Sequence, residues 1–349
     1  MEAIQKYTVQ ENLCILEALV ALNKLSSDSL TLFVLNAEGK MVGTLTDGDI
    51  RRKLIEGISL KAPVSEMMNR NFSYLTMNEK EIVRKIREYR YKGITLLPLL
   101  NEKKEIVRIY NLKKHYSVLP IDAVLMAGGK GERLRPLTEK TPKPLLPVGD
   151  KAIIDYNIER LIAYGIEHIS VTVNYLKEQI EEHFSKPFDS VKIDCVREPK
   201  FLGTMGSIKY IKKIYNDTVL VMNSDLFTNL DYEDFYVHFK KNEADMSVAA
   251  VPYPITVPYG IFDLNGRNIL GIKEKPTYNY YANAGIYLIK KELLSLIPVE
   301  EFYNATDFIE LLIKNNKKVV RFPITGYWLD IGKYEEYYKA QELVKHIYQ

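Results

Sequence analysis

The sequence predicts a doubly wound, mostly parallel α/β domain with a smaller α+β module in front of it. Its 349 residues exceed what one hydrophobic core usually covers, so two domains are expected. From about residue 120 onward, short and almost fully apolar strand segments alternate with helical segments, which is the pattern of a parallel sheet covered on both faces. The preceding residues contain a weak internal repeat instead. We therefore divide the chain into domains 1–119 and 120–349.

The repeat in the first domain has the order strand, turn, strand. The segment TLFVLNAEGKMVGTLTDGDIRRKLIEG begins at Thr31, and GITLLPLLNEKKEIVRIYNLKKHY follows about 65 residues later, so that Asn36 matches Asn101. Each copy follows a segment whose apolar residues recur at the three-to-four spacing of an amphipathic helix. A unit this small buries too little surface alone. The two copies should therefore pack together.

The first copy resembles a CBS motif, because the signature G-x-x-T-x-x-D is present as Gly43, Thr46 and Asp49. The resemblance implies that Thr46 and Asp49 bind the phosphate and ribose of a purine nucleotide. At the matching positions the second copy carries Arg108, Asn111 and Lys114, so we expect one nucleotide site. A purely structural pair, which positions the larger domain or assembles it as a homo-oligomer, stays open as the alternative.

In the second domain the segments IDAVLMAG, HISVTVN and TVLVMNSD read as buried strands, and AIIDYNIERLIAYG reads as a helix. Ligands of a doubly wound sheet bind at the carboxyl ends of its strands. Asn265-Gly266, between two apolar runs, predicts a hairpin. We therefore expect an antiparallel excursion from the main sheet.

The strongest local signal is the stretch LMAGGKGERLRPLTEKTPKPLLPVGDK, in which an apolar strand runs into Gly128, Gly129 and Gly131. Glycine allows backbone to approach a phosphate closely. The spacing fits neither the dinucleotide fingerprint nor the P-loop. Arg133 and Lys143 bracket a stretch stiffened by prolines. Taken alone, these residues would also fit a solvated surface loop.

With its flanking residues the stretch resembles the signature of the sugar-1-phosphate nucleotidyltransferase family, G-G-x-G-x-R-L-x-P-L-T followed by P-K-P. The resemblance implies a Rossmann-like catalytic domain. It also implies that Arg133 binds the leaving pyrophosphate and that Lys143 lies near the α-phosphate and the sugar phosphate. The residues around the glycine loop that would contact substrate are Leu125, Ala127, Gly128, Gly129 and Gly131.

Further segments match the same family in the same order. Asp225 and Asp330 stand at the positions of its two metal-binding aspartates, although an Asp after a strand is often a turn residue or a helix cap. The remaining matches imply contacts with the base or sugar, and they are Leu202, Gly203, Thr204, Gly206, Glu274, Lys275, Asn283 and Gly285. Taken alone, Glu274-Lys275 would be a solvated charge run.

These residue types suit the implied chemistry. An oxygen of the sugar phosphate attacks the α-phosphorus of a nucleoside triphosphate, and pyrophosphate leaves. Because both reactants are polyanions, catalysis depends on positioning and charge neutralisation. Mg²⁺ prefers one or two carboxylates together with phosphate oxygens, as Asp225 and Asp330 would supply. Lys143 and Arg133 would neutralise the charge that moves during transfer.

The loop L-G-T-x-G looks more like that of GDP-sugar synthases than that of thymidylyltransferases. A CBS pair in front of such a domain resembles bacterial surface-sugar guanylyltransferases, notably those acting on glucosamine 1-phosphate for legionaminic acid. We therefore expect GTP and glucosamine 1-phosphate as substrates. Mannose or heptose 1-phosphate, and uridylyl or thymidylyl transfer, stay open. A regulatory subunit without catalytic activity is the alternative outside the enzymes. Relatives of that kind usually lose the arginine, the lysine or one of the metal-binding aspartates, and this sequence has all four residues.

Composition excludes several other classes of protein. The net charge is only +3 and no Lys/Arg block stands out, so a nucleic-acid partner is not expected. We expect no membrane span, since no run of about 18 apolar residues occurs, and no signal peptide, since Glu17 interrupts the first apolar stretch. Cys14 and Cys195 lie far apart without a C-x-x-C pair, which favours the reducing cytoplasm.

Overall fold

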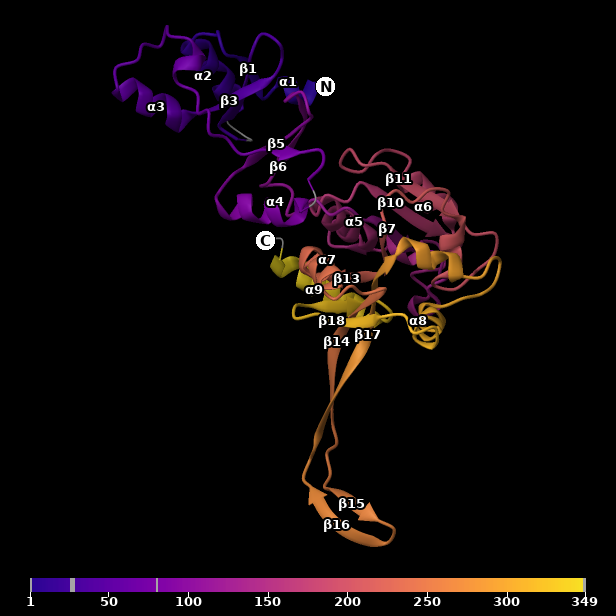
Figure 1. The fold of residues 1–349 in the computed structure, drawn as a ribbon. Helices are drawn as coiled ribbons and strands as arrows, with labels where there is room; N and C mark the ends of the chain where they lie inside the picture. The colour runs from indigo at the N-terminus through magenta and orange to yellow at the C-terminus, as the bar shows by residue number, and fades with distance from the viewer. Residues whose placement is uncertain (1, 26–28, 80, 348–349) are drawn as a thin grey trace. The chain divides into compact units, whose positions relative to one another are not determined.

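The computed structural model describes residues 2–25, 29–79 and 81–347 (Figure 1). It divides into two compact units, Met1–Val118 and Leu119–Gln349, which we call the N-terminal and C-terminal units. The division lies one residue before the boundary expected from the sequence. None of the described helices is long and apolar enough to cross a membrane.

The N-terminal unit contains the expected repeat. After α1 (Glu2–Gln5), the first copy comprises β1 (Thr8–Gln10), α2 (Ile15–Lys24), β2 (Thr31–Leu35), β3 (Met41–Thr46) and α3 (Asp47–Ile55). The second comprises β4 (Leu75–Thr76), α4 (Ile82–Tyr91), β5 (Leu96–Leu100) and β6 (Ile106–Asn111). In each copy the first strand pairs in parallel with the second, and the second pairs antiparallel with the third. The described residues after β6 form a turn where the first copy has α3.

The two copies pack against each other, as the sequence predicts. In each hairpin the turn is held by an asparagine, Asn36 or Asn101, whose side-chain oxygen accepts two backbone N–H groups of its own turn. The Met41 N–H donates to the Lys104 carbonyl across the copies at 2.9 Å. A shared hydrophobic cluster contains Phe33, Met41, Leu96 and Leu100.

The C-terminal unit is built on a seven-stranded sheet with the order β11-β10-β7-β12-β17-β14-β18. Its strands are β7 (Asp122–Met126), β10 (His168–Val173), β11 (Ile193–Arg197), β12 (Thr218–Asn223), β14 (Met246–Thr256), β17 (Thr277–Lys290) and β18 (Val319–Pro323). The first four in the spatial order are mutually parallel, β14 is parallel to β18, and β17 is antiparallel to both of its neighbours. The mostly parallel sheet is therefore confirmed, and its strand order reverses at β7.

Helices cover both faces of this sheet. They are α5 (Ile153–Ala163), α6 (Lys177–His183), α7 (Tyr232–Lys241) and α8 (Ala305–Lys314). The last helix, α9 (Tyr334–Ile347), packs beside this sheet in a cluster with Val148 and Phe227. Val219 and Val221 of β12 belong to the same core as Phe308 of α8. The neighbouring Met222 instead receives the hydroxyl of Tyr232 from α7 at 3.6 Å. Since successive strand residues point to opposite faces, α7 and α8 lie on opposite sides of the sheet.

Two smaller features of the C-terminal unit bear on its chemistry. A short ladder pairs β13 (Leu226–Thr228) with β19 (Trp328–Asp330), and another pairs β8 (Pro147–Val148) with β9 (Lys151–Ala152). Beyond the sheet, β14 and β17 continue together as a two-stranded ribbon that ends in the hairpin of β15 (Ile261–Asn265) and β16 (Asn268–Lys273) (Figure 1). The predicted Asn265-Gly266 hairpin is thus confirmed. We call residues 252–283 the arm.

Candidate active site

A cavity of about 610 Å³ lies at the carboxyl ends of β7, β10 and β12. This is the point where the strand order reverses, which is where doubly wound sheets bind ligands, and the volume suits a small molecule. The lining residues are 126–133, 143–144, 174, 198, 201, 203–204 and 223–225.

The glycine loop after β7 forms one wall of this cavity. Gly131 has a φ of +62°, and a Cβ there would lie 2.9 Å from Thr138 Cγ2. The Thr138 hydroxyl also donates to the Gly131 carbonyl at 2.8 Å. A Cβ on Gly128 would lie 2.4 Å from Glu198 Oε1. Side chains are therefore excluded at both positions, which leaves bare backbone facing the cavity.

The two expected metal-binding aspartates are brought together by the short ladder between β13 and β19. Asp225 follows β12, and Asp330 is the register partner of Leu226, the residue next to Asp225. Lys143 Nζ bonds Asp225 Oδ2 and lies 3.9 Å from Asp330 Oδ1. Burial and the neighbouring Asp225 carboxylate raise the pKa of Asp330, and the Lys143 and Arg133 cations partly offset that rise.

This carboxylate pair fits a magnesium ion. Asp225 Oδ1 is buried and has no hydrogen-bond partner in the described part of the chain. The residues that the structure describes contain no group of three or more His, Cys, Asp or Glu side chains that could hold a metal. Mg²⁺ is commonly bound by one or two carboxylates while substrate phosphates and water complete its shell. The donors present thus suit a metal that is shared with a phosphate substrate.

The two expected cations both line the cavity. Arg133 lies in a 3-10 turn, Glu132–Leu134, anchored by the fully buried Leu134. Its guanidinium packs against Gly332, where a Cβ would lie 3.1 Å from Nη2. The Lys143 side chain is only 12% exposed. The structure therefore brings Arg133, Lys143 and both aspartates into one cluster.

Sequence reasoning missed a buried carboxylate in the same cavity. Glu198 directly follows β11 and is 5% exposed. The Leu202 N–H donates to Oε2 at 3.1 Å, and the Asn174 side chain also hydrogen-bonds this carboxylate. Burial raises the pKa of Glu198. Its position at a strand end, four residues before the L-G-T loop, was the signal that could have identified it.

The expected substrate-binding residues near the cavity divide into three groups. Ala127, Gly128, Gly129, Gly131, Gly203 and Thr204 line it. Leu202 and Gly206 support the loop: Leu202 is fully buried, and a Cβ on Gly206 would lie 2.8 Å from the Glu301 carbonyl. Leu125 does not line the cavity, because its side chain is fully buried on β7, which lies between two parallel neighbours.

The expected sugar-contact residues are separated from one another. Gly285, with a φ of +72°, lies against Asn223, so close that a Cβ would be 2.6 Å from Asn223 Nδ2. Asn283 accepts the Gly285 N–H and donates to the Tyr287 hydroxyl. Both therefore lie at the edge of the cavity. Glu274 and Lys275 lie on the exposed arm and do not line the cavity, because β14 and β17 pair from Ala250–Asn283 out to Thr256–Thr277.

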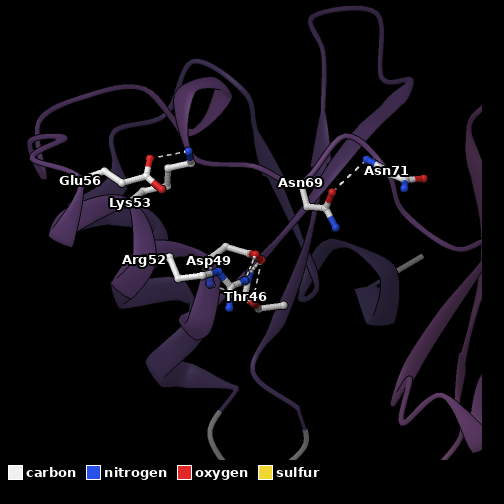
Figure 2. A network of polar contacts seen from close by, with 7 residues as sticks. All are labelled: Thr46, Asp49, Arg52, Lys53, Glu56, Asn69 and Asn71. Atoms are coloured by element: carbon white, nitrogen blue, oxygen red, sulfur yellow. Dashed lines mark hydrogen bonds and ion pairs between the residues drawn. The ribbon is translucent and has the colours of Figure 1, made fainter.

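In the N-terminal unit, Thr46 and Asp49 form the cap of α3 (Figure 2). The Thr46 hydroxyl donates to Asp49 Oδ2 at 2.6 Å, and the Asp49 N–H donates to the Thr46 oxygen at 3.1 Å. Arg52 pairs with the other oxygen of Asp49 at 2.6 Å. A Cβ on Gly43 would lie 2.7 Å from Met68 Sδ. These contacts give the motif a structural role within the repeat.

The C-terminal unit is similar to several known proteins. A D-glycero-α-D-manno-heptose 1-phosphate guanylyltransferase of Aneurinibacillus thermoaerophilus is 28% identical over 65% of this chain and 99% of its own length. A UTP–glucose-1-phosphate uridylyltransferase of Synechocystis is 30% identical over 62% of each chain. The crystal structure of HddC from Yersinia pseudotuberculosis complexed with GMP-PN has a TM-score of 0.50 and 26% identity, covering 64% of this chain and 99% of that one.

The extent of these matches differs between relatives. The chain spans 61% and 52% of the length of two other curated relatives. The nucleotidyl transferase family itself matches residues 122–346, which is most of the C-terminal unit and includes every residue of the charged cluster. The family expected from the glycine loop is thereby confirmed. The chain belongs to the nucleotidyl transferase family of enzymes.

Proposed function

We propose that the C-terminal unit transfers a guanylyl group from GTP to a sugar 1-phosphate and releases pyrophosphate. The cluster of Lys143, Arg133, Asp225 and Asp330 beside a bare glycine loop carries this proposal. Its two cations and the backbone N–H groups of the loop can bind two polyanionic reactants. Its two carboxylates can hold Mg²⁺. Among the relatives described above, the heptose 1-phosphate enzyme is named as a guanylyltransferase and the HddC structure was solved with GMP-PN, whereas the Synechocystis enzyme is named as a uridylyltransferase.

Each member of the cluster has a distinct part in the transfer. The glycine loop lets the triphosphate approach the backbone, and Arg133 neutralises the leaving pyrophosphate. Lys143 holds its ammonium group between the two aspartates, where the attacked α-phosphate would lie. Mg²⁺ bound by Asp225 and Asp330 would neutralise phosphate charge during the in-line displacement. The sugar phosphate oxygen is the nucleophile, so no side chain has to form a covalent intermediate.

Glu198 is the observation that favours guanine among the bases. Guanine presents two neighbouring donors, N1–H and the N2 amino group, on its pairing edge. Adenine, cytosine, uracil and thymine present a donor beside an acceptor. A buried carboxylate accepts from two adjacent donors but leaves a facing acceptor unpaired, which costs about 1–3 kcal/mol. The Glu198 carboxylate lies against Gly128, at the start of the glycine loop, whereas Arg133 follows the end of the loop. A base bound beside Gly128, with the phosphates toward Arg133, would therefore meet this carboxylate.

Among acceptors, glucosamine 1-phosphate is our first choice, and mannose and heptose 1-phosphates are the alternatives. An amino group at C2 requires a nearby carboxylate or carbonyl. Glu274, the acidic residue expected from the sequence at that contact, lies on the arm and does not line the cavity. The reaction fits the cytoplasm, where nucleoside triphosphates are available, and the free thiols of Cys14 and Cys195 fit a reducing compartment.

The test is pyrophosphate release by the full chain, with each of GTP, ATP, UTP, CTP and dTTP paired with glucosamine, mannose, heptose, glucose and N-acetylglucosamine 1-phosphates. We expect the highest kcat/KM with GTP and glucosamine 1-phosphate. An optimum with UTP or dTTP would refute the assignment of guanine. An optimum with GTP and mannose 1-phosphate would correct only the sugar. No release with any pair would favour the non-catalytic regulatory subunit.

We also propose that the N-terminal unit is a CBS pair that binds one purine nucleotide through Thr46 and Asp49. The identical strand pairing of its two copies supports a true repeat. Calorimetry on the full chain with AMP or ADP, which cannot act as triphosphate donors, should give a stoichiometry near one at this site. No binding would leave only the structural role.

A further inference from the structure

One wall of the cavity contains an exposed aromatic ring that has no part in the transfer steps described above. Phe201 lines the cavity and is 51% exposed, whereas the next residue, Leu202, is fully buried. A ring left half exposed forgoes part of the stabilisation that burial in the core would give. Single exposed apolar residues are common on protein surfaces, but small-molecule sites bury their ligands against apolar and aromatic side chains. Phe201 is therefore a candidate for contact with a substrate.

The loop that carries Phe201 is held in place by the segment before α8. The Tyr303 N–H donates to the Leu202 carbonyl at 3.0 Å, and the Met205 N–H donates to the Tyr303 carbonyl at 2.9 Å. Gly203 has a φ of +75°, and a Cβ there would lie 2.7 Å from the Tyr303 carbonyl oxygen. Because the backbone that follows Phe201 is held this closely, the position of its side chain is set by the fold before a ligand binds.

A second ring supports Phe201 at the rim of the cavity. The centroids of the Phe201 and Phe302 rings are 5.8 Å apart, and the rings are tilted by 55°. Tilted pairs at such distances are a favourable arrangement of aromatic side chains. Phe302 does not line the cavity, so it contacts Phe201 from outside. The pair thus holds the Phe201 ring at the cavity wall while half of that side chain stays exposed.

The Glu198 carboxylate relates this ring to the base of the nucleotide. Glu198 precedes Phe201 by three residues, and its Oε2 accepts the Leu202 N–H at 3.1 Å. The peptide group that joins Phe201 to Leu202 therefore contacts the carboxylate to which the base edge was assigned above. A carboxylate meets only the edge of a planar base. The two faces of the base still require apolar or aromatic cover, which an aromatic ring supplies by stacking.

We propose that Phe201 packs against one face of the nucleotide base whose edge meets Glu198. The contact rests on the function proposed above, because that function places the base beside Gly128. Every base has a π-face, so stacking on an aromatic ring strengthens binding with little preference among bases. Glu198 then selects the base through hydrogen bonds, and Phe201 adds affinity that all of the bases share.

Steady-state kinetics of the full chain separate this contact from the others. Phe201→Ala should raise the KM for GTP and for UTP by roughly tenfold each. The kcat, the KM for the sugar 1-phosphate and the preference for GTP over UTP should stay within about twofold of wild type. Phe201→Tyr keeps the ring and should retain the wild-type KM. Phe262→Ala, the same substitution at an exposed position on the arm, is the matched control.

Two kinetic outcomes would overturn the contact. An unchanged KM for both nucleotides in Phe201→Ala would remove the ring from the base site. A raised KM for the sugar 1-phosphate alone would assign the ring to the acceptor instead. A changed preference among the bases would contradict the division of roles between Glu198 and Phe201.

Nucleotide binding without the sugar phosphate gives a measurement that does not depend on catalysis. The natural chain has one tryptophan, so Phe201→Trp adds a second emission signal, which stacking on a base should quench. Phe302→Trp, on the outer side of the pair, is the control and should be quenched much less. Calorimetry on the same proteins with MgCl₂ and GTP, ATP, UTP, CTP or dTTP measures binding directly, and Phe201→Ala should weaken it by roughly tenfold.

These binding data distinguish failure of the contact from failure of the proposed function. Nucleotide binding seen by calorimetry without selective quenching of Phe201→Trp would overturn the contact and leave the function standing. Quenching by UTP with no binding of GTP would support the contact and refute the assignment of guanine. No binding of any of the five nucleotides to the wild-type chain would overturn both.

Discussion

The cavity of the C-terminal unit and the Thr46–Asp49 network of the N-terminal unit both match sequence motifs, yet they use their polar atoms differently. In the network, the Thr46 hydroxyl and both Asp49 oxygens bond within α3 and its cap. In the cavity, Asp225 Oδ1 has no partner in the described part of the chain, and burial raises the pKa of Asp330. Polar groups that the fold buries without satisfying are those available to a ligand. The comparison indicates chemistry in the cavity and a structural cap in the network.

Removal of the central cation should have the largest effect on the cavity. Lys143→Ala should lower kcat/KM by on the order of 10³-fold, about 4 kcal/mol, because the ammonium group between the aspartates stabilises transferring phosphate. Arg133→Ala should be comparable or milder. Steady-state pyrophosphate release measures both, and Lys140→Ala on the exposed part of the same loop is the control. A Lys143→Ala protein with altered melting temperature but intact kinetics would make the loop structural, like the network.

The two aspartates should come next. Asp225→Asn and Asp330→Asn should each lower kcat by on the order of 10² or more, since each removes a metal-binding charge, while the folded structure is kept. Activity against MgCl₂ concentration should show a much weaker apparent metal affinity. Asp194→Asn, at an exposed position on β11, is the matched control. Near-normal turnover in both variants would contradict the magnesium assignment.

Substitution of Glu198 tests base recognition separately from phosphate transfer. Glu198→Gln should reduce the kcat/KM ratio of GTP to UTP by about ten- to a hundredfold, since an amide presents a donor where guanine also presents one. The raised pKa of Glu198 means that its neutral form persists to a higher pH than usual. Wild-type kcat/KM for GTP should therefore fall as the pH is lowered through that raised pKa, and the Gln variant should lose this dependence. An unchanged base preference would remove Glu198 from the base site.

The sequence indicated the sheet and the charged cluster because each depends on local patterns. Apolar strand segments such as IDAVLMAG specify buried parallel strands, and Asp225 and Asp330 stand at fixed places in matched motifs. It did not indicate how far the arm extends, because alternating apolar residues identify a hairpin but not the point where its strands leave a sheet. Glu198 was missed because its burial and its contact with Gly128 are tertiary.

The same limit applies to residues identified by motif alone. Leu125 stands next to the glycine loop in sequence, but β7 is covered on both faces, so its side chain is buried in the core. Glu274 and Lys275 match a sugar-contact motif, but the pairing of β14 with β17 carries them away from their own cavity. Only the path of the backbone in space decides which motif residues meet.

The smallest effect is expected in the network of the N-terminal unit. Asp49→Ala should destabilise the unit by about 1 kcal/mol through loss of the cap of α3, measured as a lower melting temperature. Pyrophosphate release without added AMP or ADP should stay within about twofold of wild type, since the network takes no part in transfer. If the unit binds a purine nucleotide, the same variant should abolish that binding in calorimetry. A loss of turnover comparable to that of Asp225→Asn would contradict the claim that the network takes no part in transfer.

The most direct test of guanylyl transfer is a competition in one reaction. The full chain is incubated with equal concentrations of GTP, ATP, UTP, CTP and dTTP, together with glucosamine 1-phosphate and MgCl₂, and the nucleotide sugars are quantified by mass spectrometry at low conversion. Their ratio equals the ratio of kcat/KM values. Because a mispaired buried polar group costs about 1–3 kcal/mol, the GDP-sugar should exceed every other product by roughly ten- to a hundredfold. A predominant UDP- or dTDP-sugar, or no nucleotide sugar at all, would contradict the account.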